Sequence, residues 1–450
     1  PLAVGESREW PKTRGIRALG VVAPTATAIK FGRSLAWTGS ASPTLATRSE
    51  PLSHDLGSNA KSRAKPTITT TCDESDRLEN RAKRFALRLT ASEILDTQRA
   101  KNCGRAHASD DVQLFSSPEH GGSHFRGLQT CGSVWGCPVC SEKVSRLRSE
   151  ALSAGIEVWE GQTIGITLTF SHGRNDDLVE LIAKQAKARM KMAATRAYKE
   201  LRAQMGATLK QGGGTVRASE VTHAKPGTPN ANGWHPHSHE AWFSARTDIT
   251  ANEVADFEER LYLLWLAACQ KVGLAAPDRE HGVVASLESA ATYVSKWGLG
   301  AELTRSDMKA SQFGGCNPWQ LLQLAHDKGP HWKQAAALFK EYAEAYKGRR
   351  QLTYSRGLKA LLGIDDKSDT ELAEAQTADE AEANHVLTLS QLEWFTVVAC
   401  EAQADVLAAC EHGGQRAVKR LLSTLEAMSE SGYLSSRTKR PPAKGATIEN

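Results

Sequence analysis

Three histidines alternate with other residues in the run His235-Pro-His237-Ser-His239, and this alternation restricts the fold more than any other feature of the chain. The run lies within residues 234–243, which are predicted to form a strand. Side chains of a strand alternate between faces, so all three imidazoles are expected on one face of a sheet. Such a row has little use in a core, where each ring nitrogen needs a partner. A divalent-metal site explains it, and a solvated polar edge is the alternative.

A carboxylate in the preceding segment extends this pattern. Residues 215–223 are predicted to form a strand, and the Pro-, Gly- and Asn-containing loop at 225–233 allows antiparallel pairing with the histidine strand. Glu220 then lies beside the imidazoles. Two histidines with one acid suit Mg²⁺ or Mn²⁺ in phosphoryl chemistry, with positions left for phosphate oxygens. The alternative for Glu220 is a cross-strand ion pair.

The surrounding segments predict an α+β fold. Strands are expected at 163–170, 215–223, 234–243 and 282–287, and helices at 176–205, 253–271 and 289–297. The order strand, helix, strand, strand, helix, strand is the split βαβ pattern. It predicts one antiparallel sheet with helices on one face and the other face free for a ligand.

The last predicted helix carries Tyr293 and Lys296, which are three residues apart and share a helical face. A tyrosine hydroxyl is a poor nucleophile at its ordinary pKa of about 10. A nearby cation favours the phenolate, and Lys296 can supply it or hold a phosphate. An amphipathic tyrosine that packs its ring beside an exposed lysine is the alternative.

A group of cysteines precedes the predicted sheet. Cys137-Pro-Val-Cys140 forms a CxxC pair and Cys131 lies just before it, a spacing that suits tetrahedral Zn²⁺ in a closed structural site. The fourth ligand is expected to be Cys103, or else one of the nearby histidines His107, His120 and His124. A redox CxxC is the alternative, although no thioredoxin-like βαβ unit surrounds it.

Charge and composition set the expected environment. The net charge of +5 permits nucleic-acid binding without demanding it. Arg146 and Arg148 on a predicted helix suit phosphate contacts, and a solvated helix face is equally consistent. The odd number of cysteines, nine, with one tight group and the rest scattered, argues against a secreted disulfide framework, and no run of about 20 apolar residues predicts a membrane span. A soluble, cytoplasmic protein is expected.

The chain is expected to contain seven segments. They are a disordered N-terminal segment at 1–75, a helix plus zinc-binding segment at 76–154, a catalytic domain at 155–305, a basic and aromatic helical extension at 306–364, an acidic linker at 365–384, a small helical module at 385–430 and a disordered basic tail at 431–450.

Three segments in order resemble the motifs of HUH endonucleases: Ile166-Thr-Leu-Thr-Phe170, Trp234-His-Pro-His-Ser-His239 and Tyr293-Val-Ser-Lys296. With the upstream cysteines, the chain looks like rolling-circle plasmid replication initiators over residues 103–303. The resemblance implies the palm-like, ferredoxin-like fold of that superfamily. It also implies nicking of single-stranded or hairpin origin DNA, with helicase and polymerase supplied by the host.

The resemblance assigns roles residue by residue. His237 and His239 would bind the catalytic metal, with Glu220 as the acidic ligand and His235 as a further candidate. Tyr293 would form a 5′-phosphotyrosine link and Lys296 would assist at the phosphate.

The chain also departs from the family pattern. Ser238 stands where the family has a bulky hydrophobic residue. Trp297 stands where some relatives carry their tyrosine, and those relatives have a glutamate, thought to activate water, where Tyr293 stands in this chain. This chain lacks that glutamate, and Glu288 and Glu302 are candidate substitutes only because they lie nearby in the sequence. An HUH transposase, a non-catalytic zinc-containing DNA-binding regulator and metal-dependent hydrolysis without a covalent intermediate remain as alternatives.

Overall fold

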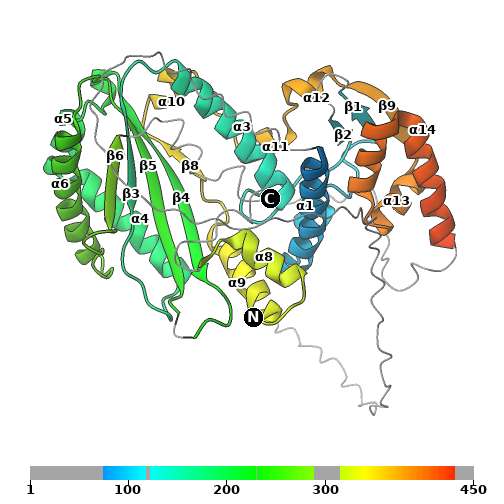
Figure 1. Cartoon of the computed structure of the whole chain (residues 1–450), viewed down its shortest axis with the longest axis horizontal. Helices are drawn as coiled ribbons and strands as arrows, with labels where there is room; N and C mark the ends of the chain where they lie inside the picture. Colours follow the sequence, from blue (N-terminus) through cyan, green and yellow to red (C-terminus); the bar gives the residue numbers. More distant parts are fainter. Residues whose placement is uncertain (1–73, 118–121, 230, 288–314, 431–450) are drawn as a thin grey trace, which may run out of the picture. The chain divides into compact units, whose positions relative to one another are not determined.

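A six-stranded antiparallel sheet carries the histidine strand in the computed structural model of this protein, which describes residues 74–117, 122–229, 231–287 and 315–430. The strand order is β6-β3-β5-β4-β7, and β8 also pairs with β4 (Figure 1). The strands are β3 (Thr163–Leu168), β4 (Gly214–Ala224), β5 (Trp234–Phe243), β6 (Val283–Leu287), β7 (Gly315–Cys316) and β8 (Leu352–Tyr354). The order β6-β3-β5-β4 is that of a split βαβ unit, so the predicted α+β class is confirmed.

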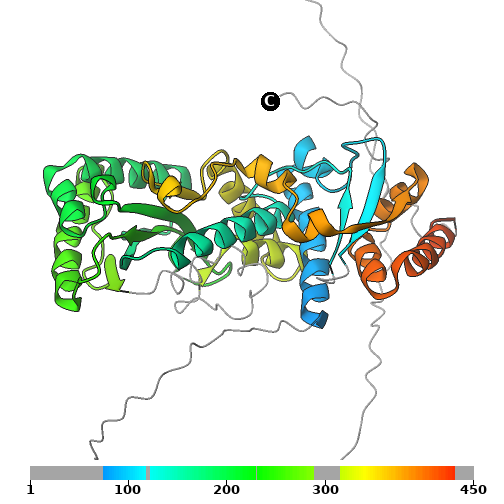
Figure 2. The same ribbon diagram turned by 90° about the horizontal axis from the view of Figure 1, so that it is seen from above.

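Helices cover one face of this sheet completely and the other face in part. Helices α4 (Leu178–Ala194) and α6 (Ala251–Gln270) share a core with Trp242 of β5. On the opposite face lies α3 (Pro138–Glu157) (Figure 2), and its Leu152 shares a core with Val216 and Phe243. Among the described residues, α3 therefore covers the part of this face near Val216 and Phe243, and the histidines lie toward the other ends of β4 and β5.

The helix predicted at 176–205 is two helices, α4 and α5 (Arg196–Gln204). Thr195 between them has φ −69° and ψ 148°, an extended conformation that ends α4. Its hydroxyl accepts a hydrogen bond from Tyr198 N and so caps α5. A Thr N-cap inside a run of good helix formers is easily overlooked, because neither proline nor glycine marks the break.

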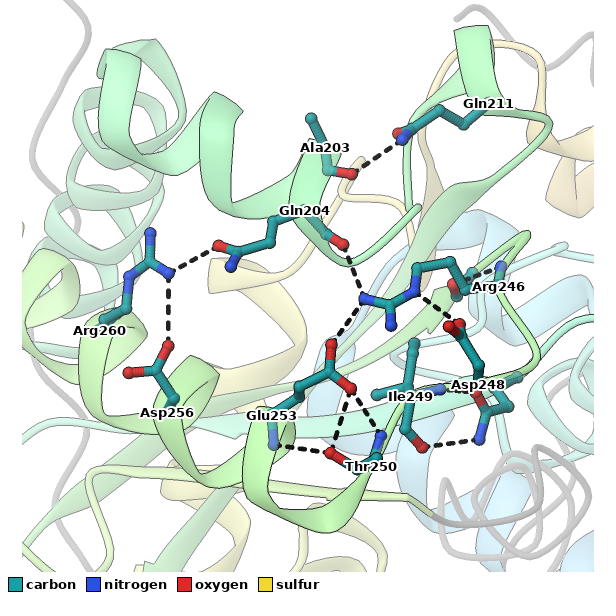
Figure 3. Close-up of polar contacts among 12 residues, drawn as sticks. Ala203, Gln204, Gln211, Arg246, Asp248, Ile249, Thr250, Glu253, Asp256 and Arg260 are labelled. Atoms are coloured by element: carbon teal, nitrogen blue, oxygen red, sulfur yellow. Dashed lines mark hydrogen bonds and ion pairs between the residues drawn. The ribbon is translucent and has the colours of Figure 1, made fainter.

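Polar contacts fix the start of α6 against the end of α5 (Figure 3). Thr250 and Glu253 form a capping box at the first turn of α6. Arg246 pairs with Glu253 at 2.8 Å and donates to the carbonyl of Gln204 at 3.2 Å. Arg260 of α6 donates to the side chain of Gln204. These bonds hold the helical layer that supports β5.

A second sheet joins segments that are far apart in the sequence. Strands β1 (Val112–Ser116), β2 (Ser123–Arg126) and β9 (Asn384–Leu389) form it in the order β2-β1-β9. It packs with α13 (Gln391–Ala399) and α14 (Gln403–Glu430) around Val112, Leu114 and Trp394. The predicted boundary at 384/385 falls inside β9, and the cysteine-containing segment and the C-terminal helices share this core.

The remaining helices complete the described chain. They are α1 (Glu74–Leu95), α2 (Gln98–Asn102), η1 (Leu209–Gln211), α8 (Pro318–His326), α9 (Trp332–Ala345), α10 (Leu358–Leu361), α11 (Asp369–Glu374) and α12 (Ala378–Glu382). The segment predicted as an acidic linker at 365–384 holds α11 and α12, and its Asp369 and Glu380 form ion pairs with Arg148 and Lys143 of α3. None of the described helices combines the length and apolar character needed to cross a membrane.

Several predicted features lie outside the described residues. They are most of the N-terminal segment at 1–75, the tail at 431–450, the helix at 289–297, His120, Tyr293, Lys296, Glu288 and Glu302.

Candidate metal centres

The pairing of β4 with β5 brings an acid against two histidines. Glu220 lies directly opposite His237 in the antiparallel register, and Ala218 lies opposite His239. Glu220 Oε2 is 3.2 Å from His237 Nε2 and 3.3 Å from His239 Nε2. Ligands that bind a metal at about 2.1 Å and at right angles lie about 3.0 Å apart. The spacing therefore fits a divalent ion with these three atoms on one side.

Both imidazoles are held so that Nε2 faces the acid. His237 Nδ1 is 3.1 Å from the carbonyl oxygen of His235, which only accepts hydrogen bonds, so Nδ1 donates to it and Nε2 has a free lone pair whenever the imidazole is neutral. His239 Nδ1 is 3.0 Å from Thr167 Oγ1 on the neighbouring strand β3. A ligand histidine is usually oriented through its second nitrogen in this way.

The carboxylate of Glu220 is charged and only partly satisfied. Burial alone would raise its pKa, but the imidazoles of His239 and His237 outweigh this and lower the pKa below its ordinary value. The same contact raises the pKa of His237 in spite of its burial. Glu220 Oε1 is buried and has no hydrogen-bond partner in the described chain. An unmatched carboxylate oxygen beside two imidazole nitrogens is a set of donor atoms that suits a cation.

This centre is accessible from outside. The side chains of Glu220, His237 and His239 are 23%, 13% and 21% exposed. A bound ion would therefore keep coordination positions for water or for substrate oxygens, as catalytic metal sites do.

His235 does not belong to the three-residue ligand group that the described residues form. Its Nε2 makes a short contact with Thr169 Oγ1, and its ring stacks on His172 with centroids 4.6 Å apart. Burial, with the neighbouring His237 and His172, lowers the pKa of His235 to about 3, so it is neutral at ordinary pH. Its carbonyl oxygen orients His237, so its backbone supports the site.

Cys103, Cys131, Cys137 and Cys140 meet in a second group, the four-cysteine cluster. Cys103 Sγ is 3.8 Å from Cys137 Sγ and 3.6 Å from Cys140 Sγ, and Cys131 Sγ is 3.6 Å from Cys140 Sγ. Four ligands at about 2.3 Å from a tetrahedral Zn²⁺ lie about 3.8 Å apart. The donor type and the spacing both fit zinc, with Cys103 rather than one of the nearby histidines in the fourth position.

Local structure explains how the cluster forms. Cys137 is the N-cap of α3 and Cys140 lies in its first turn, so both thiols lie at the positive end of the helix dipole, which favours thiolates. Gly104 follows Cys103 with φ 61°, and buried Arg88 donates to the carbonyls of both residues at 3.0 Å. Hydrogen bonds from the other three thiols lower the pKa of Cys103 well below its ordinary value, and their contact with Cys103 raises the pKa of Cys137 and Cys140, so without an ion the cluster favours a single thiolate at Cys103.

The two arginines expected to contact DNA are engaged within the chain. Arg146 pairs with Glu150 at 2.9 Å and with Glu142 at 3.8 Å. Arg148 pairs with Asp369 and donates to Gln351 at 3.2 Å. Arg146 therefore stabilises α3 itself and Arg148 its contact with α11, and phosphate contacts by either arginine remain a prediction.

Sequence reasoning missed the threonines that support the histidines. Thr167 and Thr169 contact His239 and His235, and His172 stacks on His235. The signal was present in the alternation of Thr167 and Thr169, because strand residues two apart share a face. The register that brings Thr167 opposite His239 could not be read from the sequence.

A search of curated proteins gives one informative relative. The chain is 29% identical over 342 residues to "Protein rep" of Streptomyces lividans, an alignment that covers 62% of this chain and 74% of the relative. No protein-family model matches the chain, and no solved structure matches it significantly. The chain is thus similar to a Rep protein over most of that protein's length.

Proposed function

We propose that the protein is a rolling-circle replication initiator that nicks and rejoins single-stranded origin DNA through a 5′-phosphotyrosine intermediate. The observation that carries the proposal is the group of Glu220, His237 and His239 on adjacent strands, with ligand atoms all within 4.8 Å of one another. The similarity to "Protein rep" supports a replication initiator and favours it over a transposase.

In this proposal Glu220, His237 and His239, which we call the Glu220 site, would hold Mg²⁺ or Mn²⁺, and the bound ion would supply polarisation of the scissile phosphate. The partial exposure of these three side chains would leave room for phosphate oxygens. Thr167 and the carbonyl of His235 keep the imidazoles in the binding orientation. The four-cysteine cluster holds Zn²⁺ and has a structural role.

Tyr293 is the proposed nucleophile. Its hydroxyl oxygen forms a bond to phosphorus and loses its proton, the bond from phosphorus to the 3′-oxygen breaks, and the 3′-oxygen gains a proton. Lys296 stabilises the developing charge at the phosphate. In the sequence both residues follow Leu287, the last residue of β6, and β3 lies between β6 and the histidine strand in the sheet. Rejoining is the reverse reaction, with the 3′-hydroxyl as nucleophile.

A denaturing gel tests the covalent step. The full chain is incubated with Mn²⁺ and a 3′-labelled single-stranded oligonucleotide that contains the origin nick site, because a 5′-phosphotyrosine stays with the labelled fragment. We expect a labelled adduct that needs the metal, that Tyr293→Phe abolishes and that Tyr354→Phe leaves unchanged.

The other outcomes separate the alternatives. Cleavage without an adduct would mean hydrolysis by the metal site alone. Binding without cleavage, unchanged in Tyr293→Phe, would mean a non-catalytic DNA-binding protein.

A further inference from the structure

A cavity of about 480 Å³ lies on the side of β4 and β5 opposite the Glu220 site. Ser219 of β4 and Ser238 of β5 are a cross-strand pair, next to the pair of Glu220 and His237, and both serines line the cavity. Because strand side chains alternate, the serines face away from the metal ligands. The cavity is bounded by α4, by the segment after α9 and by β8. Its volume is typical of small-molecule sites, which hold about 300–1,000 Å³.

Arginine side chains supply all the charge of the cavity lining. Four arginines line the cavity, Arg189, Arg217, Arg349 and Arg350, and no acidic residue does. Arg189 is paired with Glu240 of β5. Arg217 forms no hydrogen bond or ion pair with any residue that the structure describes. Burial and the nearby Arg189 lower the pKa of Arg217 to about 10, so its guanidinium is still charged at neutral pH.

Two buried polar side chains point to a ligand as well. Ser238 is 2% exposed and its hydroxyl has no partner within the described residues, although it lines the cavity. Gln185 of α4 is 9% exposed, and its Nε2, which only donates, is also without a partner there. Buried polar groups are nearly always satisfied. Glu240 lies opposite Arg217 in the strand register but is paired with Arg189, so the guanidinium of Arg217 can bind an anion.

We propose that this cavity binds a phosphate group, carried by free phosphate or a nucleotide or by a DNA backbone. The guanidinium of Arg217 offers parallel N–H donors that match phosphate oxygens. Gln185 Nε2 and Ser238 Oγ supply two further donors from opposite walls. Arg350 is exposed, so the cavity reaches the surface and a ligand can enter. The site does not depend on the nicking reaction, because it shares no side chain with the Glu220 site.

Binding measurements on the full-length protein test the site. The probes are inorganic phosphate, followed by calorimetry, and a fluorescent oligodeoxythymidylate, followed by anisotropy. We expect Arg217→Gln to weaken binding of at least one probe by about tenfold or more. Arg196→Gln, which removes the same charge from a side chain that is 92% exposed, should change neither affinity.

The two probes distinguish the source of the phosphate. Phosphate binding that depends on Arg217 assigns the site to free phosphate or a nucleotide. Oligonucleotide binding that depends on Arg217, with no effect of free phosphate, assigns it to the DNA backbone. If wild type binds neither probe, or if Arg217→Gln leaves both affinities unchanged, the proposal is wrong.

Ser238→Ala provides a second test that does not rely on a charge change. Removing a buried hydroxyl without a partner should leave the melting temperature unchanged or raise it. The same substitution should weaken binding of the probe that occupies the site several-fold, because the ligand loses a donor. Unchanged affinity in a folded Ser238→Ala protein would contradict the proposal.

Discussion

The four-cysteine cluster and the Glu220 site differ in the burial of their metal-binding side chains and in the arrangement of these side chains around a potential ion. The cysteines are 3–6% exposed, and their sulfur atoms are spaced as the corners of one tetrahedron. Glu220, His237 and His239 are 13–23% exposed and could contact an ion from one side only. The first arrangement closes the coordination shell, and the second leaves it open.

The difference shows what each site contributes. The four-cysteine cluster ties together Cys103, just after α2, and the first turn of α3, so a bound ion acts on folding. The Glu220 site lies on strands that are already paired along their whole length, so the sheet does not need the ion. Removal of a ligand should therefore unfold the first region and inactivate the second.

The largest effect is expected for Cys140→Ser. A structural zinc in small domains contributes about 10–16 kcal/mol, which is comparable to the whole stability of a domain, about 5–15 kcal/mol. We expect zinc to be lost and the cooperative thermal transition to disappear or fall steeply. Zinc analysis and calorimetry measure both. Cys400→Ser, at a half-buried cysteine outside the cluster, should retain zinc and the transition; a stable, zinc-free Cys140→Ser protein would remove the contrast between the two sites.

Glu220→Gln should reduce activity strongly and leave the stability of the protein nearly unchanged. The amide lacks the charge that holds the ion, and a metal that polarises a phosphate contributes several kcal/mol to catalysis, so adduct formation should fall by roughly 100-fold or more. The melting temperature should change by only a few degrees. Adduct yield and calorimetry are compared with Glu200→Gln, an exposed glutamate of α5 that should leave both unaltered. A large loss of stability would mean that this site, too, is structural.

A smaller effect is expected for Thr167→Val. Valine has nearly the same shape but cannot bond to His239 Nδ1, and loss of such a partner typically weakens metal affinity by about 10–100-fold. Titration with Mn²⁺ followed by electron paramagnetic resonance gives the affinity. Thr163→Val, at the start of the same strand, is the matched control. Equal affinities in the two variants would show that the imidazole needs no orienting bond.

The smallest effect is expected for the pH dependence of Mn²⁺ affinity at the Glu220 site. Protonation of His237 Nε2 excludes the metal, and contact with Glu220 raises the pKa of His237. Affinity for Mn²⁺ should therefore be highest above the raised pKa and should begin to fall, as pH decreases, before an ordinary histidine titrates near about 6.5. Titrations at several pH values between about 8 and 5.5 measure it. A constant Mn²⁺ affinity over this range would contradict the assignment of His237 as a ligand.

Local patterns in the sequence were sufficient to predict which side chains lie close together where one short segment of the chain carries the pattern. Alternation predicted one face for the histidines, and the short loop before Trp234 predicted that Glu220 would lie beside them. Cysteine spacing predicted three members of the four-cysteine cluster, and Cys103 was the first choice for the fourth.

Long-range register was not accessible in the same way. Nothing near residues 112–116 indicates that they pair with residues 384–389, because each strand is short and its partner is remote. α3 covers the Val216 end of the sheet face that carries the histidines, because Leu152 packs there. A leucine can pack against many apolar surfaces, so the sequence does not predict this contact. Likewise, Ser238 in the sequence is only a departure from a family pattern, and the structure is needed to show that it lines an arginine-rich cavity.

The central claim is that the two sites hold two ions in different ways, and metal analysis after mild chelation tests it most directly. Purified protein is dialysed against a weak chelator, its zinc is measured by mass spectrometry, and Mn²⁺ is then titrated in. We predict one zinc per folded chain that survives dialysis, and one exchangeable Mn²⁺ that Glu220→Gln eliminates. A folded protein without zinc, or Mn²⁺ binding that is unchanged in Glu220→Gln, would contradict the account.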